Sequence, residues 1–472
     1  MSLALLGAVL LAATDVARAA FPGGDGEAIE GAAAASAQPI LLGVFPQGEL
    51  TNPDAMDELR ALDDWSKAVG GARTSIAGTF IDLEVGYPEF NVFEQLERAW
   101  VAGYTPMVKI GTSRTTAEVA AGRVDGALYA WARVLANWTT NRTRTVFIAP
   151  FPEMNGRGNA YSLDPPSFRA AFKRIQSVFA SSGVPDRAVR WVFAPNGWSD
   201  PADPPFEDYY PDGADVDVVG FSQYNWGYCP GTQWDSWDDP TSASDSLFRQ
   251  YLPRIRALAP SKPVFLLQTA STAQSPKRAA MDPARKNEWL RALYAWAADE
   301  GVRGIMYFNS HKECDWEVFK VGGVRFEGYR QAVRDPRYAY LPPDALASTA
   351  LAAAGPCVPT ATAMCLQGGR FRVEISWSGF AGDGGQARVV AGGTTDSGLF
   401  YFYGPNNWEL LVKVLDGCAE NDRFWVFSAA ATNLAYTLTV TDTRNGATRT
   451  YANPLGKAGA AITDTQAFDT CS

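Results

Sequence analysis

Eight short apolar runs, separated by segments with the periodicity of amphipathic helices, constrain the fold of this chain more than any other feature. Each run is long enough for one strand and is apolar along its length, which is typical of parallel strands buried on both faces. The runs lie at residues 40–45, 74–81, 105–110, 145–151, 189–194, 216–221, 264–267 and 302–308. Strands that alternate with crossover helices form βαβ units, so residues 39–340 predict an α/β fold, the (β/α)₈ TIM barrel.

The segments between the runs predict the helices that cover such a barrel. They lie at residues 55–69, 92–102, 125–137, 167–181, 246–259 and 283–300. Several begin after Asp or Ser and end near Gly, as helices commonly do. Ser167 follows two prolines, and we expect it to be the N-cap of the fourth helix.

Polar and aromatic side chains gather where the predicted strands end, which is where a TIM barrel carries its active site. Aromatic faces stack on pyranose rings, and amide and phenol groups bond to sugar hydroxyls, so the pattern predicts a cleft that binds a polysaccharide. The alternative is that the rings only close the end of the barrel. The candidate substrate-binding residues are Asn155, Trp198, Tyr224, Trp226, Phe308, Asn309, His311 and Trp316.

Charge and composition exclude several other functions. The 41 basic and 51 acidic residues give a net charge of −10, and no basic stripe suits a phosphate backbone, so we expect no nucleic-acid partner. His311 is the only histidine, which rules out a multi-histidine metal site. No glycine-rich phosphate loop follows a predicted strand. We therefore expect no metal and no cofactor, and chemistry that depends mainly on carboxylates.

Three of the strand ends resemble glycoside hydrolase family 26, which includes the β-mannanases and related β-glycanases. The segment FPEMNG at residues 151–156 resembles the His-Glu-Met-Asn-Gly segment of that family. VVGFSQY at 218–224 is similar to its strand six, and YFN at 307–309 with Asp315 and Trp316 is similar to its strand eight. The resemblance spans roughly residues 40–335. It implies a (β/α)₈ barrel that cleaves β-linked glycans with retention, with Glu153 as the acid/base.

The chain departs from the family at two positions. Pro152 stands where the family usually has a histidine before its acid/base residue. Gln268 stands after strand seven, where the resemblance places the nucleophilic glutamate. An amide carries no negative charge, whereas retaining hydrolysis needs a carboxylate about 5 Å from the acid. The standard route is therefore closed to a chain with this sequence.

Three alternatives remain open at the level of the sequence. Asp82, Glu84 or Asp315, on the same barrel face, could serve as the base of an inverting pair. An N-acetyl group of the substrate could attack the anomeric carbon while Gln268 orients it. The third alternative is a non-catalytic glycan-binding protein that kept the cleft and lost the nucleophile. The first two describe a glycosidase acting on a β-linked polysaccharide such as mannan or β-glucan.

The N-terminal residues predict export. An apolar run at residues 3–13 is followed by Ala17, Arg18 and Ala19, a small-x-small pattern suited to signal-peptide cleavage, although no basic residue precedes Arg18. We expect a signal peptide at 1–19, a linker at 20–38, and a secreted or periplasmic monomer. No other segment is long and apolar enough to span a membrane.

Six cysteines in an apparently exported chain predict three disulfides. Cys229 and Cys314 lie in the barrel region, after strands six and eight, and should pair with each other. The other four fall in the last part of the chain, where three pairings remain possible: Cys357, Cys365, Cys418 and Cys471.

Residues 357–472 predict a separate all-β domain, after a linker at 341–356 that is rich in Pro and Ala. Runs at 371–377, 398–403, 409–415, 423–427 and 436–441 alternate at strand period between Gly, Asn and Asp residues. They predict a sandwich, which resembles a module attached to many secreted bacterial proteins. Carbohydrate binding, attachment to a cell surface and structural support are all open roles for it.

Overall fold

The computed structural model describes most of the chain from residue 39 onward. The described residues are 39–84, 88–211, 216–230, 235–240, 246–260, 262–278, 280–349, 351, 357, 359–444 and 446–471. The predicted signal peptide at 1–19 and linker at 20–38 lie outside them, as does most of the second half of the predicted linker at 341–356.

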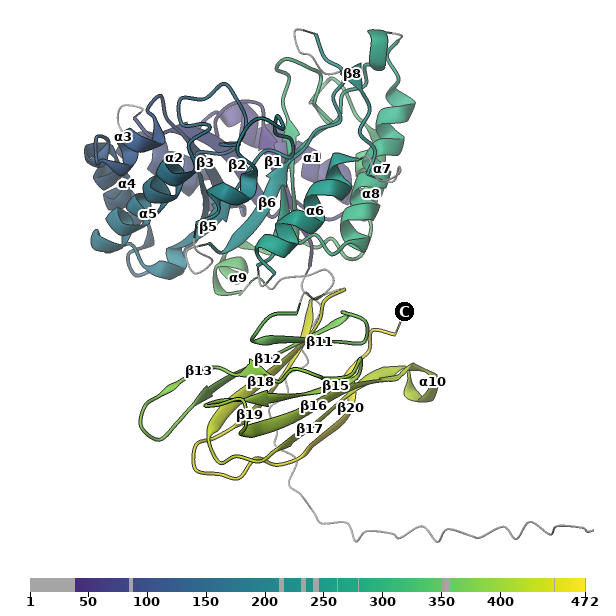
Figure 1. Ribbon diagram of the computed structural model, residues 1–472. Helices are drawn as coiled ribbons and strands as arrows, with labels where there is room; N and C mark the ends of the chain where they lie inside the picture. The colour runs from purple at the N-terminus through teal and green to yellow at the C-terminus, as the bar shows by residue number, and fades with distance from the viewer. Residues whose placement is uncertain are drawn as a thin grey trace, which may run out of the picture. The chain divides into compact units, whose positions relative to one another are not determined.

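Eight parallel strands close into a barrel in the order β1-β10-β9-β6-β5-β4-β3-β2, of which β1, β2, β3, β5 and β6 can be followed in Figure 1. Each corresponds to one of the eight apolar runs, so the predicted TIM barrel is confirmed. The strands are β1 (Leu41–Pro46), β2 (Ile76–Asp82), β3 (Thr105–Gly111), β4 (Val146–Pro150), β5 (Val189–Phe193), β6 (Val218–Ser222), β9 (Val264–Thr269) and β10 (Gly304–Asn309). A short antiparallel pair, β7 (Gly227–Tyr228) and β8 (Asp235–Ser236), lies between β6 and the next helix.

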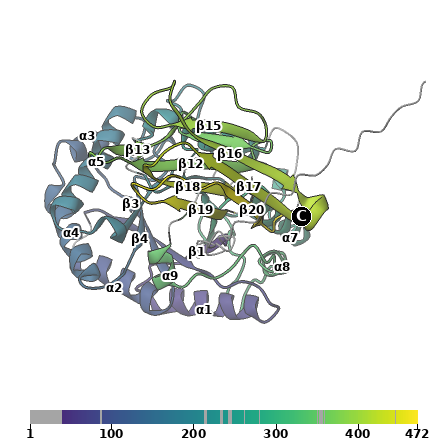
Figure 2. The ribbon, with the colours of Figure 1, turned by 90° about the horizontal axis from the view of Figure 1, so that it is seen from below.

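Helices lie outside the barrel strands, as Figure 2 shows beside β1, β3 and β4. They bury apolar side chains in the core that they share with the strands, which keeps water from the parallel sheet. They are α1 (Pro53–Lys67), α2 (Pro88–Val101), α3 (Thr116–Ala120), α4 (Asp125–Thr139), α5 (Pro165–Ser181), α6 (Leu247–Leu258), α7 (Pro283–Asp299), α8 (Glu327–Ala332) and α9 (Pro343–Ser348). The short helix α9 falls inside the stretch that the sequence predicted to be a linker.

The start of α5 corrects one prediction. Asp164 is the N-cap, and its side chain accepts a hydrogen bond from the backbone N–H of Ser167 at 3.1 Å. Pro165 and Pro166 fill the first two helical positions, where a missing N–H costs nothing. The expectation that Ser167 caps the helix was therefore wrong, because the two prolines begin the helix rather than precede it.

Three disulfides link the six cysteines. Cys229 and Cys314 are joined, as predicted, and tie the loop after β6 to the loop after β10. In the C-terminal region the bridges are Cys357–Cys365 and Cys418–Cys471, which settles the pairing that the sequence left open. None of the described helices combines the length and the apolar character that a bilayer span requires.

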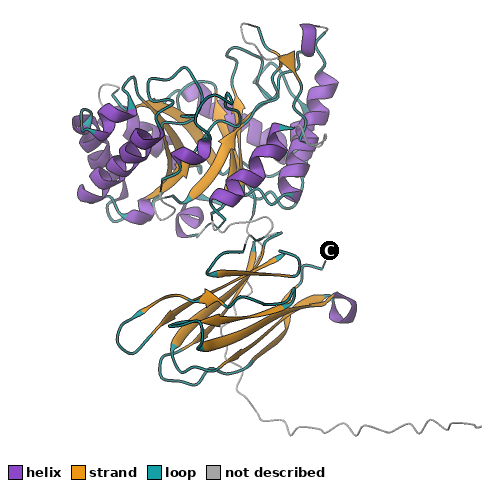
Figure 3. Ribbon diagram, in the orientation of Figure 1, coloured by secondary structure: helices purple, strands orange, loops and turns teal. Residues whose placement is uncertain are grey.

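The C-terminal region is built of antiparallel strands, with one short helix, α10 (Cys418–Asn421) (Figure 3). One sheet has the order β11-β12-β18-β19, with β13 beside β12, and the other has the order β14-β15-β16-β17-β20. Apolar residues of both sheets share one core, as predicted for a sandwich. The strands are β11 (Ala363–Leu366), β12 (Phe371–Ser378), β13 (Gly384–Gln386), β14 (Arg388–Val389), β15 (Ser397–Tyr401), β16 (Trp408–Gly417), β17 (Arg423–Ala430), β18 (Ala435–Asp442), β19 (Ala447–Asn453) and β20 (Ile462–Phe468).

Candidate active site

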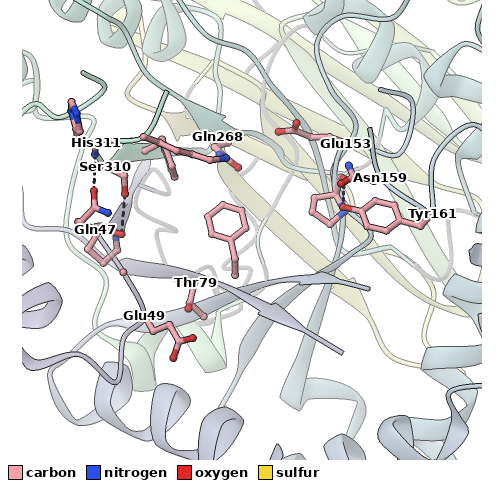
Figure 4. A pocket seen from close by; sticks show the side chains of 15 residues that line it. Gln47, Glu49, Thr79, Glu153, Asn159, Tyr161, Gln268, Ser310 and His311 are labelled. Carbon is pink, nitrogen blue, oxygen red and sulfur yellow. Dashed lines mark hydrogen bonds between the residues drawn. The ribbon is translucent and has the colours of Figure 1, made fainter. Parts of the chain in front are cut away.

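A cavity of about 480 Å³ opens at the carboxyl ends of the barrel strands. Glu153 and Gln268 both line it, and Figure 4 shows the Glu153 carboxyl group and the Gln268 amide pointing toward one another. Phe308 and His311, two of the predicted substrate-binding residues, also line it. The cavity therefore brings together four of the residues selected from the sequence.

Glu153 sits in a strained turn directly after β4. Its φ is 60° and that of Phe151 is 50°, a region that residues with a side chain adopt at a cost of about 1–2 kcal/mol each. The neighbouring backbone holds the turn, since the Glu153 N–H donates to the carbonyl of Ala194 at 2.8 Å. The hydroxyl of Tyr161 donates to the carbonyl of Pro152 at 3.2 Å. Such strain is typical of residues held in place for function.

Asn155 is buried two residues beyond Glu153 and joins the loops that follow β4 and β5. Its Oδ1 accepts from the backbone N–H of Asn196 at 2.8 Å, and its Nδ2 donates to the carbonyl of Asn196 at 3.0 Å and to Ser199 Oγ at 2.6 Å. Asn196 is thereby positioned so that its Nδ2 lies 3.4 Å from Glu153 Oε2, to which it donates. Asn155 thus reaches the carboxyl group through Asn196.

Gln268 lies near the end of β9, beside an irregularity in its pairing with β6. Ser222 pairs with Gln268, whereas Phe221 pairs with Leu266, so β9 carries one extra residue at this point. A bulge of this kind redirects a side chain, and bulges are frequent beside active sites. The Gln268 side chain is only 7% exposed, yet it reaches the cavity.

Lys109 lies on β3 inside the barrel and donates to the side-chain oxygen of Gln268. Its Nζ also lies 3.4 Å from Ser222 Oγ, to which it donates. The side chain is 0% exposed. The Nε2 of Gln268 in turn donates to the hydroxyl of Tyr224. Gln268 therefore lies between a buried ammonium group and a phenol.

Burial is the main influence on the pKa values of Lys109 and Tyr224. It lowers the pKa of Lys109 to about 8, although the negative charge of Glu153 opposes the change. Burial raises the pKa of Tyr224 well above its ordinary value, and the charge of Glu153 adds to that effect. Near neutral pH, Lys109 is therefore charged and Tyr224 protonated.

An aromatic cluster supports Tyr224 from behind. Its ring centroid lies 5.4 Å from that of Trp226, 5.0 Å from that of Trp316 and 6.3 Å from that of Phe308. Trp316 is fully buried and Trp226 is half-buried. Of the four rings, Phe308 is the one that lines the cavity. Trp316 therefore acts on the cavity through Tyr224.

The loop after β10 places the remaining predicted residues. Asn309 is buried, and its side chain accepts from the N–H of Val318 at 2.8 Å and donates to the carbonyl of Phe319 at 2.9 Å. This organises the loop that exposes His311, whose Nδ1 lies 3.7 Å from Glu317 Oε2. Trp198 is half-buried after β5 and lies outside the lining of the cavity.

The carboxylates considered as alternative bases do not line this cavity. Glu84 is engaged by Arg114, with Nε to Oε2 at 3.1 Å, and Asp82 accepts from the N–H of Glu84 at 2.8 Å. Asp315 accepts a hydrogen bond from the hydroxyl of Thr272. Among the described residues, no group of three or more His, Cys, Asp or Glu side chains is placed to hold a metal ion.

Several lining residues were not selected from the sequence. They come from the ends of β1, β2 and β4, and include Gln47, Glu49, Thr79, Phe80, Asn159 and Tyr161. Figure 4 shows the Glu49 carboxyl group far from that of Glu153 in the cavity. Lys109 also escaped selection, although a lysine within an apolar run at 105–110 is a signal that the sequence does carry.

No family model matches the chain, and no curated protein matches it. Solved structures do. An endo-β-1,4-mannanase double mutant of Cellulomonas fimi is 14% identical, with 88% of this chain and 94% of that chain covered and a TM-score of 0.47. A mannanase of Bacillus subtilis is 16% identical, with 64% and 87% covered and a TM-score of 0.42.

A family 26 β-mannanase of Bacteroides ovatus is 14% identical, with 64% of this chain and 90% of that chain covered and a TM-score of 0.45. The chain is similar in fold to family 26 mannanases. The description of the Bacteroides ovatus structure names family 26, the family that the strand ends resemble. At such identities the likeness concerns the fold alone, and the roles of individual residues rest on the geometry of the cavity.

Proposed function

We propose that this protein is a glycoside hydrolase-like protein of the family 26 type that binds a β-linked polysaccharide, such as mannan or β-glucan, in the cavity at the barrel mouth. The observation that carries the proposal is the arrangement of Glu153 and Gln268, which point toward one another across that cavity. A glycosidase needs two groups on opposite sides of the scissile bond.

In this proposal Glu153 is the acid. Its carboxyl group reaches the cavity from a strained turn, and Asn196 donates to it, so its position is fixed before a ligand binds. Gln268 occupies the second position and acts on the substrate as an amide. Phe308 and His311 contact the sugar chain from the wall after β10. Four other predicted residues act by holding the loops around the cavity: Asn155, Asn309, Trp226 and Trp316. Trp198 extends the binding surface along the rim of the cavity.

A second candidate function is glycan binding without turnover. Gln268 favours it, because an amide cannot form the covalent intermediate of a retaining enzyme. The bond from Lys109 favours it further, because an amide oxygen that accepts a hydrogen bond from an ammonium group is a still poorer nucleophile. In this reading the cavity keeps the shape of a glycosidase site, and the protein captures a polysaccharide.

We further propose that the chain works as an exported monomer. Three disulfides among the described residues suit an oxidising compartment, and the predicted signal peptide would direct the chain there. The C-terminal sandwich would then be an accessory domain. Residues 1–19, 39–340 and 357–472 are the proposed signal peptide, barrel and sandwich.

The test is to incubate the full chain with β-mannan and with mixed-linkage β-glucan, and to measure both binding and release of reducing ends. Glu153→Gln is the informative variant, because it removes the acid with little change of shape. Turnover that is lost in Glu153→Gln supports the hydrolase. Binding without turnover, unchanged in the variant, supports the second candidate. If native protein neither binds nor cleaves any β-glycan tested, the proposal fails.

A further inference from the structure

Lys109 determines the orientation of the Gln268 amide, that is, which groups its oxygen and its nitrogen contact. An ammonium group can only donate hydrogen bonds, so the atom it contacts must be the carbonyl oxygen of the amide. The amide nitrogen must then lie on the other side, where it donates to the hydroxyl of Tyr224. The assignment follows from the chemistry of the three groups, since exchanging the amide's oxygen and nitrogen would place two donors against each other.

This orientation gives the wall of the cavity a donor character. The Gln268 amide has a second N–H, and its carbonyl oxygen is occupied by Lys109. The Tyr224 hydroxyl accepts from Gln268, so its own proton is directed elsewhere. Burial and the charge of Glu153 raise the pKa of Tyr224 well above its ordinary value, so that proton stays in place. A donor of Gln268 therefore lines the cavity where a retaining glycosidase has an acceptor carboxylate.

The charge on the Gln268 side of the cavity is opposite in sign to that of a retaining glycosidase. A retaining pair consists of two carboxyl groups, whereas here one carboxyl group, Glu153, faces an amide backed by the Lys109 ammonium group. Phe45 and Phe80 flank that ammonium group, with ring centroids 5.4 Å and 5.8 Å from Nζ. Buried among these rings, the positive charge is poorly screened by solvent.

We propose that the cavity selects a β-glycan whose sugar ring carries an acceptor oxygen on the side facing Gln268. This oxygen belongs to a carbonyl or carboxylate substituent. Lys109 is the positioning residue that sets this preference. The inference rests on the proposed function, because it names the substrate class of the same site. Two substituents can supply this acceptor oxygen: the carbonyl of a 2-acetamido group and the carboxylate of a uronic acid. Glu153 repels the second, so the acetamido sugar is the preferred one.

The experiment compares the binding of three oligosaccharides of equal length to the full chain by calorimetry. They are a β-1,4-linked N-acetylglucosamine oligomer, a β-1,4-linked glucuronate oligomer and a neutral β-1,4-linked mannose oligomer. One hydrogen bond made or lost changes affinity about tenfold, so we expect the acetamido oligomer to bind about tenfold more tightly than the neutral one. A preference for glucuronate instead would identify the carboxylate as the source of the acceptor.

Lys109→Met separates positioning from structural support. Without the ammonium group the amide is free to turn, so the ratio of acetamido to neutral affinity should fall to about one, whereas a folding defect would lower both affinities together. Lys67→Met, an exposed lysine at the end of α1, is the matched control and should keep the native ratio. Gln268→Glu should also abolish the preference, because a carboxylate at this position accepts and cannot donate.

Three results would overturn the inference. Equal or tighter binding of the neutral oligomer by native protein would overturn it while leaving the proposed function standing. If Lys109→Met and Gln268→Glu both keep the native ratio of acetamido to neutral affinity, the inference is also overturned and the proposed function still stands. Failure to bind any of the three oligomers would also overturn it, and the proposed function would fall as well only if the protein binds neither β-mannan nor mixed-linkage β-glucan.

Discussion

The buried ammonium group of Lys109 makes the stability of this protein depend on alkaline pH in a calculable way. Burial lowers the pKa of Lys109 to about 8, from 10.5 in an exposed lysine. Between these two values the unfolded chain binds a proton that the folded chain has released. The free energy of unfolding therefore rises with pH over that interval and is lowest below it, where both states are protonated.

The size of the effect follows from the two pKa values. From pH 7 to pH 9, the Lys109 titration should add about 1 kcal/mol to the free energy of unfolding. Lys286 contributes in the same direction, because burial lowers its pKa to about 7, which adds about 2 kcal/mol over the same interval. Lys109→Met removes the first contribution and leaves the second. Its rise in stability between the two pH values should be smaller than that of native protein by about 1 kcal/mol.

The assay is urea unfolding of native protein, Lys109→Met and Lys67→Met at both pH values, with the barrel signal followed by tryptophan fluorescence. Each variant is compared with itself at the two pH values, so any constant change caused by the substitution cancels. Lys67 is exposed, and its variant should rise as the native protein does. An equal rise in Lys109→Met and native protein would show that Lys109 titrates normally, and would refute its placement as a buried cation beside Gln268.

Three further predictions concern the supports of the site. Asn155→Ala removes three hydrogen bonds to the loop after β5, so we expect unfolding to become easier by about 3 kcal/mol in urea titrations, and no change would contradict the geometry. Asp164→Ala removes the N-cap of α5 and should cost about 1 kcal/mol in the same assay, whereas Ser167→Ala should cost little. Non-reducing peptide mapping should recover Cys229 joined to Cys314, and free thiols there would argue against export.

The barrel was predictable because its signal is repeated eight times. Each buried strand needs an apolar run, and each crossover needs an amphipathic helix, so errors at single boundaries do not change the topology. The N-cap of α5 was misassigned because a pair of prolines reads equally well as a break before a helix or as its first turn. The pairing of the last four cysteines depends on how two sheets pack, and local patterns do not contain that information.

A residue of the site could be predicted only where both its chemical type and its place directly after a predicted strand indicated the barrel mouth. Glu153 follows an apolar run directly, so its place at the barrel mouth could be read from the sequence. Lys109 lies in the middle of a run, and its bond to Gln268 joins residues 159 positions apart. The extra residue that β9 carries opposite β6 turns Gln268 toward both partners, and register shifts of this kind leave no mark on an apolar run.

The most direct test of the central claim is the rate of β-glycan hydrolysis in Gln268→Glu compared with native protein. The new carboxylate would lie against the ammonium group of Lys109 and the hydroxyl of Tyr224, which should keep it ionised and able to act as a nucleophile opposite Glu153. The account predicts that hydrolysis of β-mannan or mixed-linkage β-glucan appears or rises strongly, and that adding Glu153→Gln abolishes it. Pro152 limits the rescue, because the histidine that family 26 usually places there is absent. A Gln268→Glu variant that folds, binds glycan and hydrolyses no faster than native protein would contradict the claim that Glu153 and residue 268 occupy the two catalytic positions of a glycosidase site.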